Sequence, residues 1–341
     1  MTNASDTIST VPRALVIGHR GASGYRPEHT ASAYELAFAL GADAVEPDIV
    51  ATKDGVLVLR HENEISGTTD VAAHPEFAKR KTTKTIDGQS LSGWFTEDFT
   101  WKELSTLRAI ERLPQLRQPS TSFDGHERIL RLSDLIRIIV VASARAGREL
   151  AMVAEIKHAN YFESIGLPLD ELFSQAITPW ATPTNLIVEA FEESVLLKIR
   201  ERGVPGKLVF LADRAGAPAD LVAENGAKAR SYADHLTDEG LARLAAEVDG
   251  VSVDKRLIVS GGGEGVTDLV ARTQAAGLLA FTWTLRAENK FLAKRFRRGS
   301  TPSDFGDWRG EFQLVLGTGI DGVFTDQPDL AVAAREVGSA T

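Results

Sequence analysis

The chain of 341 residues contains no cysteine and no long hydrophobic run. Without cysteine it can form no disulfide bond, no thiolate metal site and no cysteine nucleophile. No stretch approaches the roughly 18 apolar residues that identify a membrane-spanning helix, and we expect no stable membrane association. Residues 1–13 lack the basic and apolar segments of a secretory signal, so we expect a cytoplasmic protein.

The chain also lacks an excess of basic residues. Its 38 Lys and Arg stand against 47 Asp and Glu, which gives a formal net charge of -9, and the basic residues are scattered along the sequence. Non-specific nucleic-acid binding needs a basic face that neutralises phosphates, so we expect no nucleic-acid partner. An anionic substrate would need local positive charge, from a metal ion or from a few well-placed Arg and Lys side chains.

Hydrophobic residues make up 43% of the chain and occur as short runs that alternate with amphipathic helical periods. The expected strands are 14–18, 43–49, 150–156, 185–190, 206–211, 249–253, 278–284 and 320–324, and the expected helices are 30–40, 133–147, 168–178, 192–202, 264–276 and 309–316. This alternation predicts a parallel sheet. Eight strands rich in Val, Ile and Leu favour a closed (β/α)8 TIM barrel, with an open doubly wound sheet as the alternative.

A plain barrel needs about 250 residues, so this chain has a surplus. We expect a single domain over residues 1–341, with most of the surplus in a cap insertion at about 62–130 that lies over the active-site rim. A second, smaller excursion is expected at 296–308, a stretch rich in Gly, Ser, Pro and Asp.

Two segments have sequence patterns that fit more than one structure. The fifth repeat, residues 212–248, has room for one or two helices and a short extra strand at 229–232. Residues 290–298 are basic with interleaved aromatic residues. We expect a helix there, with Phe291, Leu292 and Phe296 packed inward and the charged side chains in solvent, rather than a membrane-binding surface.

Acidic residues follow the expected strands. Glu46 and Asp48 are two apart, so their side chains point to the same side of a strand, and Glu155 closes another strand. Carboxylates on one face repel each other unless a cation lies between them. These three acids, with waters and a substrate phosphate, would complete a Ca²⁺ or Mg²⁺ site. Lys157 faces the same way as Glu155 and would either contact a phosphate oxygen or form a salt bridge with Glu155.

Two histidines occupy the ends of apolar runs. His19 and His61 both close such runs, and Arg20 follows His19 directly. Hydrolysis of a phosphodiester needs one group to activate the nucleophile and another to protonate the leaving alkoxide, and two histidines meet that need. Arg20 would neutralise charge on the phosphate oxygens. Glu28 belongs either to a loop that ends in a helix cap at Thr30 or to the partners that orient His19 or Arg20.

Several motifs together resemble the glycerophosphodiester phosphodiesterase family. They are His19-Arg20-Gly-Ala-Ser-Gly-Tyr-Arg-Pro-Glu-His-Thr30, Gly41-Ala-Asp-Ala-Val-Glu46-Pro-Asp48, Thr52-Lys-Asp-Gly-Val-Leu-Val-Leu-Arg-His61, Gly93-Trp-Phe-Thr-Glu-Asp-Phe-Thr-Trp101, Glu155-Ile-Lys157, Glu189-Ala-Phe191, Thr282-Trp283-Thr284 and Asp321-Gly-Val-Phe-Thr-Asp326-Gln-Pro-Asp329. The resemblance covers nearly the whole chain. It implies a capped (β/α)8 barrel with one divalent ion, Ca²⁺ or Mg²⁺, that hydrolyses glycerophosphodiesters to sn-glycerol 3-phosphate and an alcohol.

By position, the resemblance implies a role for each site residue. The catalytic acid/base pair is His19 and His61, the metal ligands are Glu46, Asp48 and Glu155, the phosphate contacts are Arg20 and Lys157, and the walls of the glycerol or alcohol side are Phe191 and Trp283. One departure concerns the residue after His61, which is usually Asp in the family and is Glu62 here.

Three alternatives remain open from the sequence. The substrate would be either a glycerophosphodiester or, in a second interpretation, a lysophospholipid or a glycerophosphate wall polymer. A third hypothesis is a barrel that binds metal and phosphate without catalysis, but mere binding would not need two proton carriers. The nucleophile is either water or the glycerol 2-hydroxyl, which would give a cyclic phosphate intermediate.

Overall fold

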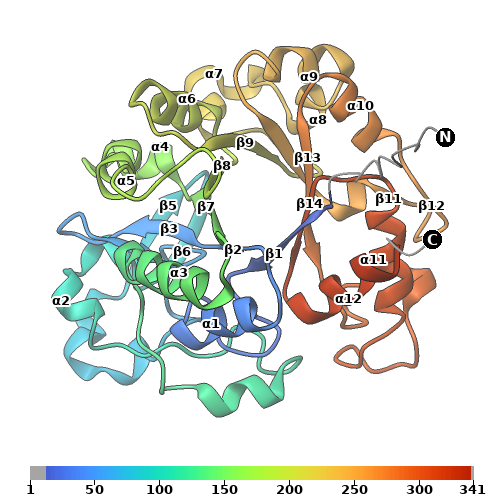
Figure 1. Cartoon of the computed structure of the whole chain (residues 1–341). Helices are drawn as coiled ribbons and strands as arrows, with labels where there is room; N and C mark the ends of the chain where they lie inside the picture. Colours follow the sequence, from blue (N-terminus) through green and yellow to red (C-terminus); the bar gives the residue numbers. More distant parts are fainter. Residues whose placement is uncertain (1–12, 339–341) are drawn as a thin grey trace, which may run out of the picture.

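The computed structural model describes residues 13–338, which form a barrel of parallel strands surrounded by helices (Figure 1). The barrel strands are β1 (Leu15–His19), β2 (Ala44–Glu46) with β3 (Asp48–Ala51), β7 (Ala151–Ile156), β8 (Leu186–Ala190), β9 (Lys207–Ala212), β10 (Gly250–Asp254), β13 (Leu279–Leu285) and β14 (Gly322–Thr325). β2 and β3 form one barrel strand that is interrupted at Pro47.

Parallel pairing closes the barrel. β1 pairs with β14 on one side and with β2 on the other, and β7 pairs with both β2 and β3. The predicted (β/α)8 barrel is therefore confirmed, and the open-sheet alternative is wrong. The short β4 (Leu57–Leu59) adds an antiparallel strand beside β3 and carries the chain to His61.

Six of the helices that cover the barrel lie close to the predicted ranges. They are α1 (Ala31–Ala39), α3 (Leu132–Ala146), α5 (Leu169–Ile177), α6 (Glu193–Glu201), α10 (Leu269–Ala275) and α11 (Trp308–Leu316). Two further helices, α4 (Ala159–Ser164) and α12 (Pro328–Gly338), were not predicted. The helix expected at 264–276 begins late, because Gly265–Val266 (β12) pairs instead with Val259–Ser260 (β11) in a small hairpin. None of the helices within residues 13–338 has the length and apolar content needed to cross a bilayer.

The fifth repeat differs from its prediction. It contains α7 (Ala219–Asn225), α8 (Tyr232–His235) and α9 (Asp238–Leu244), and the short strand expected at 229–232 is absent from this described segment. Ser231 starts a helix there instead. Its hydroxyl accepts a hydrogen bond from the backbone N–H of Asp234, and the backbone N–H of Ser231 donates one to the Asp234 carboxylate. This reciprocal cap stabilises the first helical turn.

The surplus segment contains little regular structure. Within residues 62–130 lie the hairpin of β5 (Thr82–Ile86) and β6 (Gln89–Gly93), the short helix α2 (Trp101–Leu104) and four 3-10 turns. In Figure 1 this segment, which includes α2, forms a lobe at the lower left of the barrel, beside α1. We call residues 62–130 the cap.

The helix expected at 290–298 is wrong in extent. Within this segment, helical structure is limited to the 3-10 turn Lys294–Phe296. The Asn289 amide donates to the backbone carbonyls of Arg298 (2.5 Å) and Thr301 (3.1 Å), which holds this segment as a compact loop. The inward packing is confirmed for Leu292 and Phe296, which are buried.

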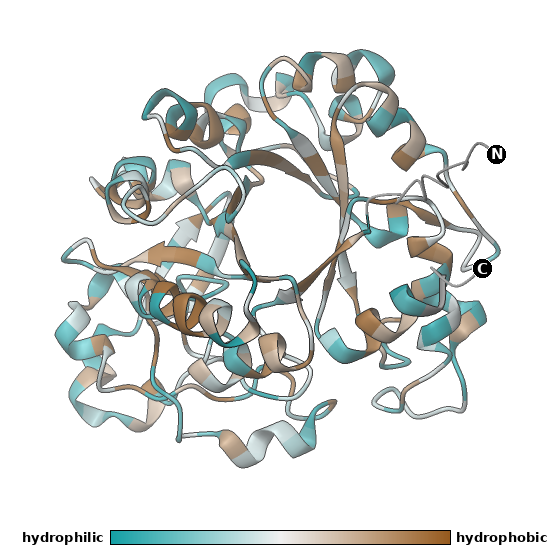
Figure 2. Ribbon diagram, in the orientation of Figure 1, coloured by the Kyte–Doolittle hydropathy of each residue, from teal (hydrophilic) through white to brown (hydrophobic). Residues whose placement is uncertain are grey.

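The core has two parts. Hydrophobic residues line the strands and the helix faces that turn toward them (Figure 2). A smaller cluster fills the inside of the barrel with Ile17, Ala44, Val153, Ile187, Val209, Phe281 and Phe324. Because the interior is packed with side chains, the barrel is a solid scaffold, and chemistry is left to the loops and strand ends at its rim.

Candidate active site

The predicted site residues gather at one end of the barrel. His19 ends β1, Glu46 ends β2 and Glu155 lies near the end of β7. A cavity of about 120 Å³ opens between these strand ends. It is lined by His19, Arg20, Glu46, His61, Glu155, Glu189, Phe191, Leu211, Trp283, Thr284, Arg286 and Phe324. Seven of the predicted residues thus line a single cavity, at the end of the barrel where parallel strands present their functional side chains.

A tight turn after β1 aims Arg20. Arg20 and Gly21 both have positive φ, 59° and 87°. A Cβ atom at Gly21 would lie 2.6 Å from the backbone carbon of Ala33, so only glycine fits this turn against α1. The turn lets the backbone N–H of Arg20 donate to the Glu46 carboxylate (2.7 Å), which fixes that acid at the cavity.

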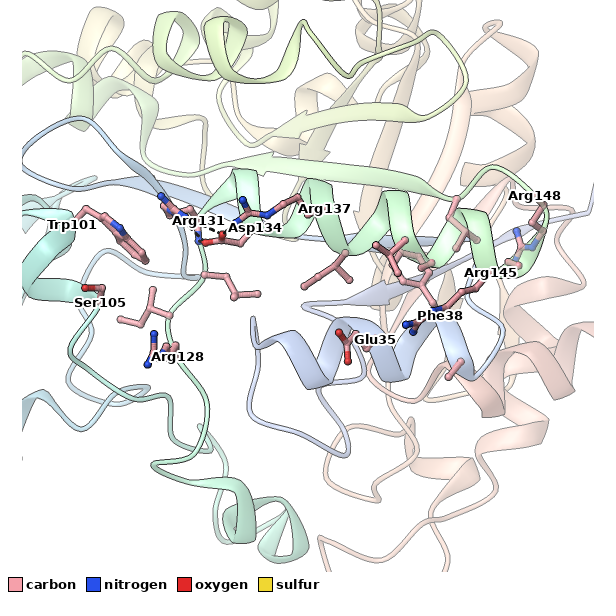
Figure 3. A pocket seen from close by; sticks show the side chains of 18 residues that line it. Glu35, Phe38, Trp101, Ser105, Arg128, Arg131, Asp134, Arg137, Arg145 and Arg148 are labelled. Atoms are coloured by element: carbon pink, nitrogen blue, oxygen red, sulfur yellow. Dashed lines mark hydrogen bonds and ion pairs between the residues drawn. The ribbon is translucent and has the colours of Figure 1, made fainter.

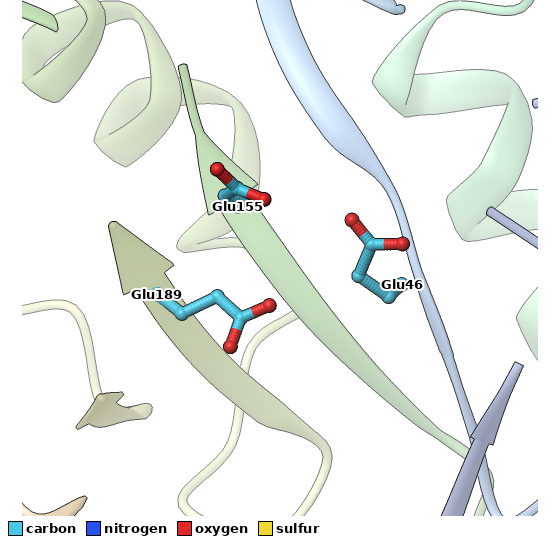
Figure 4. Close-up of side chains that lie close together, drawn as sticks. All are labelled: Glu46, Glu155 and Glu189. Atoms are coloured by element: carbon cyan, nitrogen blue, oxygen red, sulfur yellow. The ribbon is translucent and has the colours of Figure 1, made fainter. Parts of the chain in front are cut away.

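Three carboxylates point toward one another from neighbouring strands (Figure 4). Glu46, Glu155 and Glu189 each offer an oxygen within 4.8 Å of the other two. Burial raises the pKa of all three, and repulsion from neighbouring acids adds to the shift, which brings the pKa of Glu155 to about 8. Such a cluster favours either bound protons or a cation between the carboxylates.

Asp48 lies beside this cluster but is not part of it. Its Oδ2 accepts a hydrogen bond from His29 Nε2 (2.9 Å) and lies 3.3 Å from Arg20 Nε. Its Oδ1 is buried and accepts no hydrogen bond from the described residues, with Lys157 Nζ at 3.6 Å. Although burial opposes ionisation, the charges of Lys157 and Arg20 and the hydrogen bond from His29 hold the pKa of Asp48 well below its usual range. An ionised carboxylate with one free oxygen fits a cation ligand.

Both histidines are held by a carboxylate behind the ring. His19 Nδ1 lies 2.6 Å from Asp326 Oδ1, and His61 Nδ1 lies 2.5 Å from Glu62 Oε1. Each Nδ1–H donates to its carboxylate, so each Nε2 is left with a free lone pair. Burial, with the charge of Arg20, lowers the pKa of His19 to about 4 and of His61 to about 3. The two rings are therefore neutral near pH 7.

Glu28 is a partner of arginine. Its carboxylate accepts a hydrogen bond from Arg20 (2.9 Å) and two from Arg112, a cap residue (2.7 and 2.6 Å). The helix cap expected at Thr30 is also present, because the Thr30 hydroxyl accepts a hydrogen bond from the backbone N–H of Ala33 at the start of α1. Both features predicted for this loop are therefore present, although the orienting contact reaches Arg20 and not His19.

Lys157 forms the salt bridge that the sequence allowed. Its Nζ donates to Glu155 Oε1 at 2.8 Å. The same Nζ lies 5.8 Å from the centre of the Phe191 ring, at the mouth of the cavity. Lys157 therefore balances the charge of the acids while it remains next to the space where a ligand would bind.

Aromatic side chains separate the small cavity from a larger one. The Phe191 ring packs edge-on against Trp283 at 5.7 Å and against Tyr232 at 6.0 Å. Beyond Phe191 lies a second cavity of about 550 Å³ that reaches the hairpin of the cap, and Glu155 and Phe191 line both cavities. At the tip of that hairpin, Asp87 accepts a hydrogen bond from His158 Nδ1 (2.5 Å).

A larger hollow lies elsewhere. A groove of about 720 Å³ runs between α1 and α3 and is lined by arginines and apolar residues (Figure 3). Phe38 and Arg145 are among its side chains, and none of the predicted site residues lines it. Its size does not make it the active site, because it carries neither histidine nor the acidic cluster.

Sequence reasoning missed four residues of this site. Asp326 and Glu189 stand in motifs that were recognised, but no role was assigned to them. Their position in the sequence could have identified them, since Asp326 directly follows β14 and Glu189 lies next to the last residue of β8. Arg112 and Arg117 lie in the cap, where the sequence has no periodic pattern to place them.

An eight-stranded parallel barrel with two carboxylate-held histidines beside clustered acids defines a class of barrel hydrolases. The profile of the Glycerophosphoryl diester phosphodiesterase family matches residues 19–330. The glycerophosphodiester phosphodiesterase GDPD6 of Arabidopsis thaliana is 30% identical over 332 residues, which cover 92% of this chain and 84% of that protein. The chain therefore belongs to the glycerophosphoryl diester phosphodiesterase family, as the sequence motifs predicted.

Solved structures show the same fold. A Silicibacter pomeroyi protein assigned to the glycerophosphoryl diester phosphodiesterases superposes with a TM-score of 0.62 and 20% identity, over 96% of this chain and 95% of that one. An Oleispira antarctica phosphodiesterase, crystallised with the product sn-glycerol-3-phosphate, superposes with a TM-score of 0.58 and 20% identity, over 95% and 97%.

Proposed function

We propose that this protein hydrolyses glycerophosphodiesters to sn-glycerol 3-phosphate and an alcohol, with a divalent cation and a pair of histidines. One observation carries the proposal. His19 and His61 line the same cavity as Glu46 and Glu155, and each ring is held by a carboxylate at Nδ1. Two proton carriers beside a cluster of acids suit the cleavage of a phosphodiester better than binding alone.

The donor set fits a hard divalent ion, Ca²⁺ or Mg²⁺. We assign its ligands to Glu46, Asp48 and Glu155, as the sequence predicts, with Glu189 close enough to join them. The free, buried Oδ1 of Asp48 and the raised pKa values of the glutamates support this assignment. When bound, the ion would neutralise charge on the phosphate oxygens.

The chain's own residues move the protons. One histidine takes the proton of the attacking hydroxyl on its Nε2. The other has to bind a proton on its Nε2 when the anionic phosphate enters the cavity, and as an imidazolium it then gives this proton to the leaving alkoxide. The carboxylates behind both rings stabilise the imidazolium form when it appears and keep each Nε2 aimed into the cavity. Arg20 and Lys157 would contact phosphate oxygens, and Arg20 is held for this by Glu28 (2.9 Å).

The two cavities suit the two halves of the substrate. The cavity of about 120 Å³ has room for the glycerol side, and the larger one of about 550 Å³ has room for the alcohol. Phe191 stands between them and, together with Trp283, would wall the glycerol side. The product complex of the Oleispira antarctica phosphodiesterase supports the choice of sn-glycerol 3-phosphate as product.

The proposal is tested with a panel of glycerophosphodiesters. Glycerophosphocholine and glycerophosphoethanolamine are incubated with chelated protein and then with Ca²⁺ or Mg²⁺ added back, and glycerol 3-phosphate is measured. We expect turnover only after a cation returns, and none with His19→Ala or His61→Ala. Turnover by either variant at the wild-type rate would contradict the assignment of the two histidines.

A further inference from the structure

One arginine of the cap holds the carboxylate behind His61. Arg112 donates through Nη1 and Nη2 to both oxygens of Glu62, at 3.1 and 2.6 Å. Its Nε and Nη2 also donate to Glu28, at 2.7 and 2.6 Å. Among residues 13–338, His61 and Arg112 are the only side chains that bond the Glu62 carboxylate. Within the described residues, Arg112 is therefore the one side chain besides His61 that holds the Glu62 carboxylate in place.

A second arginine of the cap holds the carboxylate behind His19. Arg117 Nη2 donates to Asp326 Oδ2 at 2.5 Å, while Asp326 Oδ1 accepts from His19 at 2.6 Å. Arg117 is itself fixed by Glu288 (2.8 Å) and by the carbonyl of Ser23 (2.8 Å), and it is buried. The two sides of the site thus have the same order of groups: histidine, carboxylate and cap arginine.

Both arginines come from one turn. The backbone N–H groups of Leu116 and Arg117 donate to the carbonyl of Leu113, each at 2.9 Å. This turn sets the spacing of residues 112 and 117, so a displacement of the loop would disturb both carboxylates at once. One short segment of the cap backbone, residues 112–117, therefore connects to the carboxylates of both histidines.

We propose that Arg112 and Arg117 are positioning residues, through which the cap fixes the orientation of both catalytic histidines. The inference rests on the proposed function for the role of His19 and His61, although the contacts themselves do not. Arg112 contacts both oxygens of Glu62 and Arg117 contacts one oxygen of Asp326, and such charge-assisted contacts keep a carboxylate ionised and in one rotamer. A carboxylate held in this way keeps the proton of its histidine on Nδ1 and prevents the ring from turning.

The two arginines differ in whether another cation holds the same carboxylate when the arginine is removed. Asp326 keeps a second cation when Arg117 is lost, because Arg286 Nε also donates to it at 2.6 Å. Among residues 13–338 no second Arg or Lys pairs with Glu62, and a third of its side chain is exposed. We therefore expect Arg112→Met to have the larger effect.

The first test compares kcat and KM for Arg112→Met, Arg117→Met and a control, Arg80→Met. Arg80 also lies in the cap and is paired with a carboxylate, that of Glu103, but neither residue lines the catalytic cavity. We expect kcat to fall about 10- to 100-fold for Arg112→Met, with a smaller fall for Arg117→Met, little change in KM and near wild-type values for the control. If both variants kept the kcat of the control, the proposal would be wrong.

A double-mutant cycle separates positioning from loss of structure. Arg112→Met is combined with Glu62→Gln, and Arg117→Met with Asp326→Asn. We expect the loss in each double variant to be close to that of its worse single variant, because the two residues act as a unit. If the fold-losses of kcat in the two single variants multiplied in the double variant, the arginine and its carboxylate would act independently, which would contradict the proposal.

A measurement that needs no turnover tests the inference independently of the proposed function. The ¹⁵N signals of the histidine rings are recorded at neutral pH, with His19 and His61 assigned from single substitutions. We expect both rings to carry the proton on Nδ1, and only the His61 signals to shift toward a mixture of tautomers in Arg112→Met. Unchanged His61 signals in that variant would overturn the inference, even if the wild type hydrolyses glycerophosphodiesters. If the wild type is inactive but the shift occurs, only the proposed function fails.

Discussion

Glu62 Oε1 lies 2.5 Å from His61 Nδ1, so the acid that follows the histidine in the sequence stands directly behind its ring. The family usually has the shorter Asp at this position. Here the longer side chain still reaches the ring, and it also reaches Arg112 in the cap. Glu62 in place of Asp therefore keeps the orienting contact with His61.

This contact predicts the effect of removing the charge of Glu62. Glu62→Gln should lower kcat about 10-fold or more, because the neutral amide stabilises an imidazolium less than a carboxylate does. Glu62→Asp keeps the charge and should retain more activity than Glu62→Gln. Steady-state kinetics of the two variants check this order, and equal kcat values for Glu62→Gln and the wild type would contradict it.

The turn after β1 predicts a large loss of stability for Gly21→Ala. A positive φ costs an L-residue about 1–2 kcal/mol, and overlap with the backbone of Ala33 would add about 1–3 kcal/mol. Gly125→Ala is the matched control, since Gly125 has φ 78° and a Cβ there would meet no atom within 4 Å. Urea unfolding of both variants measures the difference. Equal losses would show that the packing against Ala33 is not tight.

The acidic cluster predicts that a divalent cation stabilises the fold. A ligand that binds the native state alone raises the free energy of unfolding by about 2.7 kcal/mol at 100 times its Kd. Ca²⁺ or Mg²⁺ should therefore raise the Tm of the chelated wild type. Glu155→Gln should reduce this rise, whereas Glu163→Gln, which removes an exposed acid paired with Lys198, should keep it. A rise of the same size in all three proteins would place the cation elsewhere.

The raised pKa of Glu192 predicts that the free energy of unfolding depends on pH. Burial raises its pKa to about 8, with further contributions from the negative charges of Asp87 and Asp220. The folded state therefore holds this proton at pH values where the unfolded chain, with an ordinary glutamate pKa of about 4.5, has released it. The stabilising contribution is present below pH 4.5 and is lost as the pH rises toward 8.

The matched variant is Glu192→Gln, whose amide oxygen can still accept the hydrogen bond from the backbone of Asn160 (2.8 Å). The variant should lose less stability than the wild type between pH 5 and pH 8, as measured by urea unfolding at each pH. Parallel pH profiles for the two proteins would show that Glu192 is ionised in the folded state.

Much of the fold and part of the site could be predicted because a parallel barrel links sequence order to position. Each short apolar run became a strand, and all carboxyl ends of parallel strands meet at one rim. His19, Glu46 and Glu155 could therefore be placed together without knowledge of any loop. The extra strand expected at 229–232 failed because the capping pair Ser231 and Asp234 starts a helix there.

The contacts that hold the site could not be predicted in the same way. Arg112 and Arg117 reach Glu62 and Asp326 across 50 and 209 positions of the sequence. The path of an irregular cap decides such contacts, and no hydrophobic period records that path. Glu189 is a different case, since it ends a predicted strand and only its role went unrecognised.

The central claim is that one divalent cation binds among the acids beside both histidines. A crystal grown with Ca²⁺ and sn-glycerol 3-phosphate tests it most directly. We predict an ion at about 2.3–2.6 Å from carboxylate oxygens of Glu46, Asp48 and Glu155, with the phosphate group between His19 and His61. Density for the phosphate elsewhere, or no ion among these three carboxylates at saturating Ca²⁺, would contradict the account.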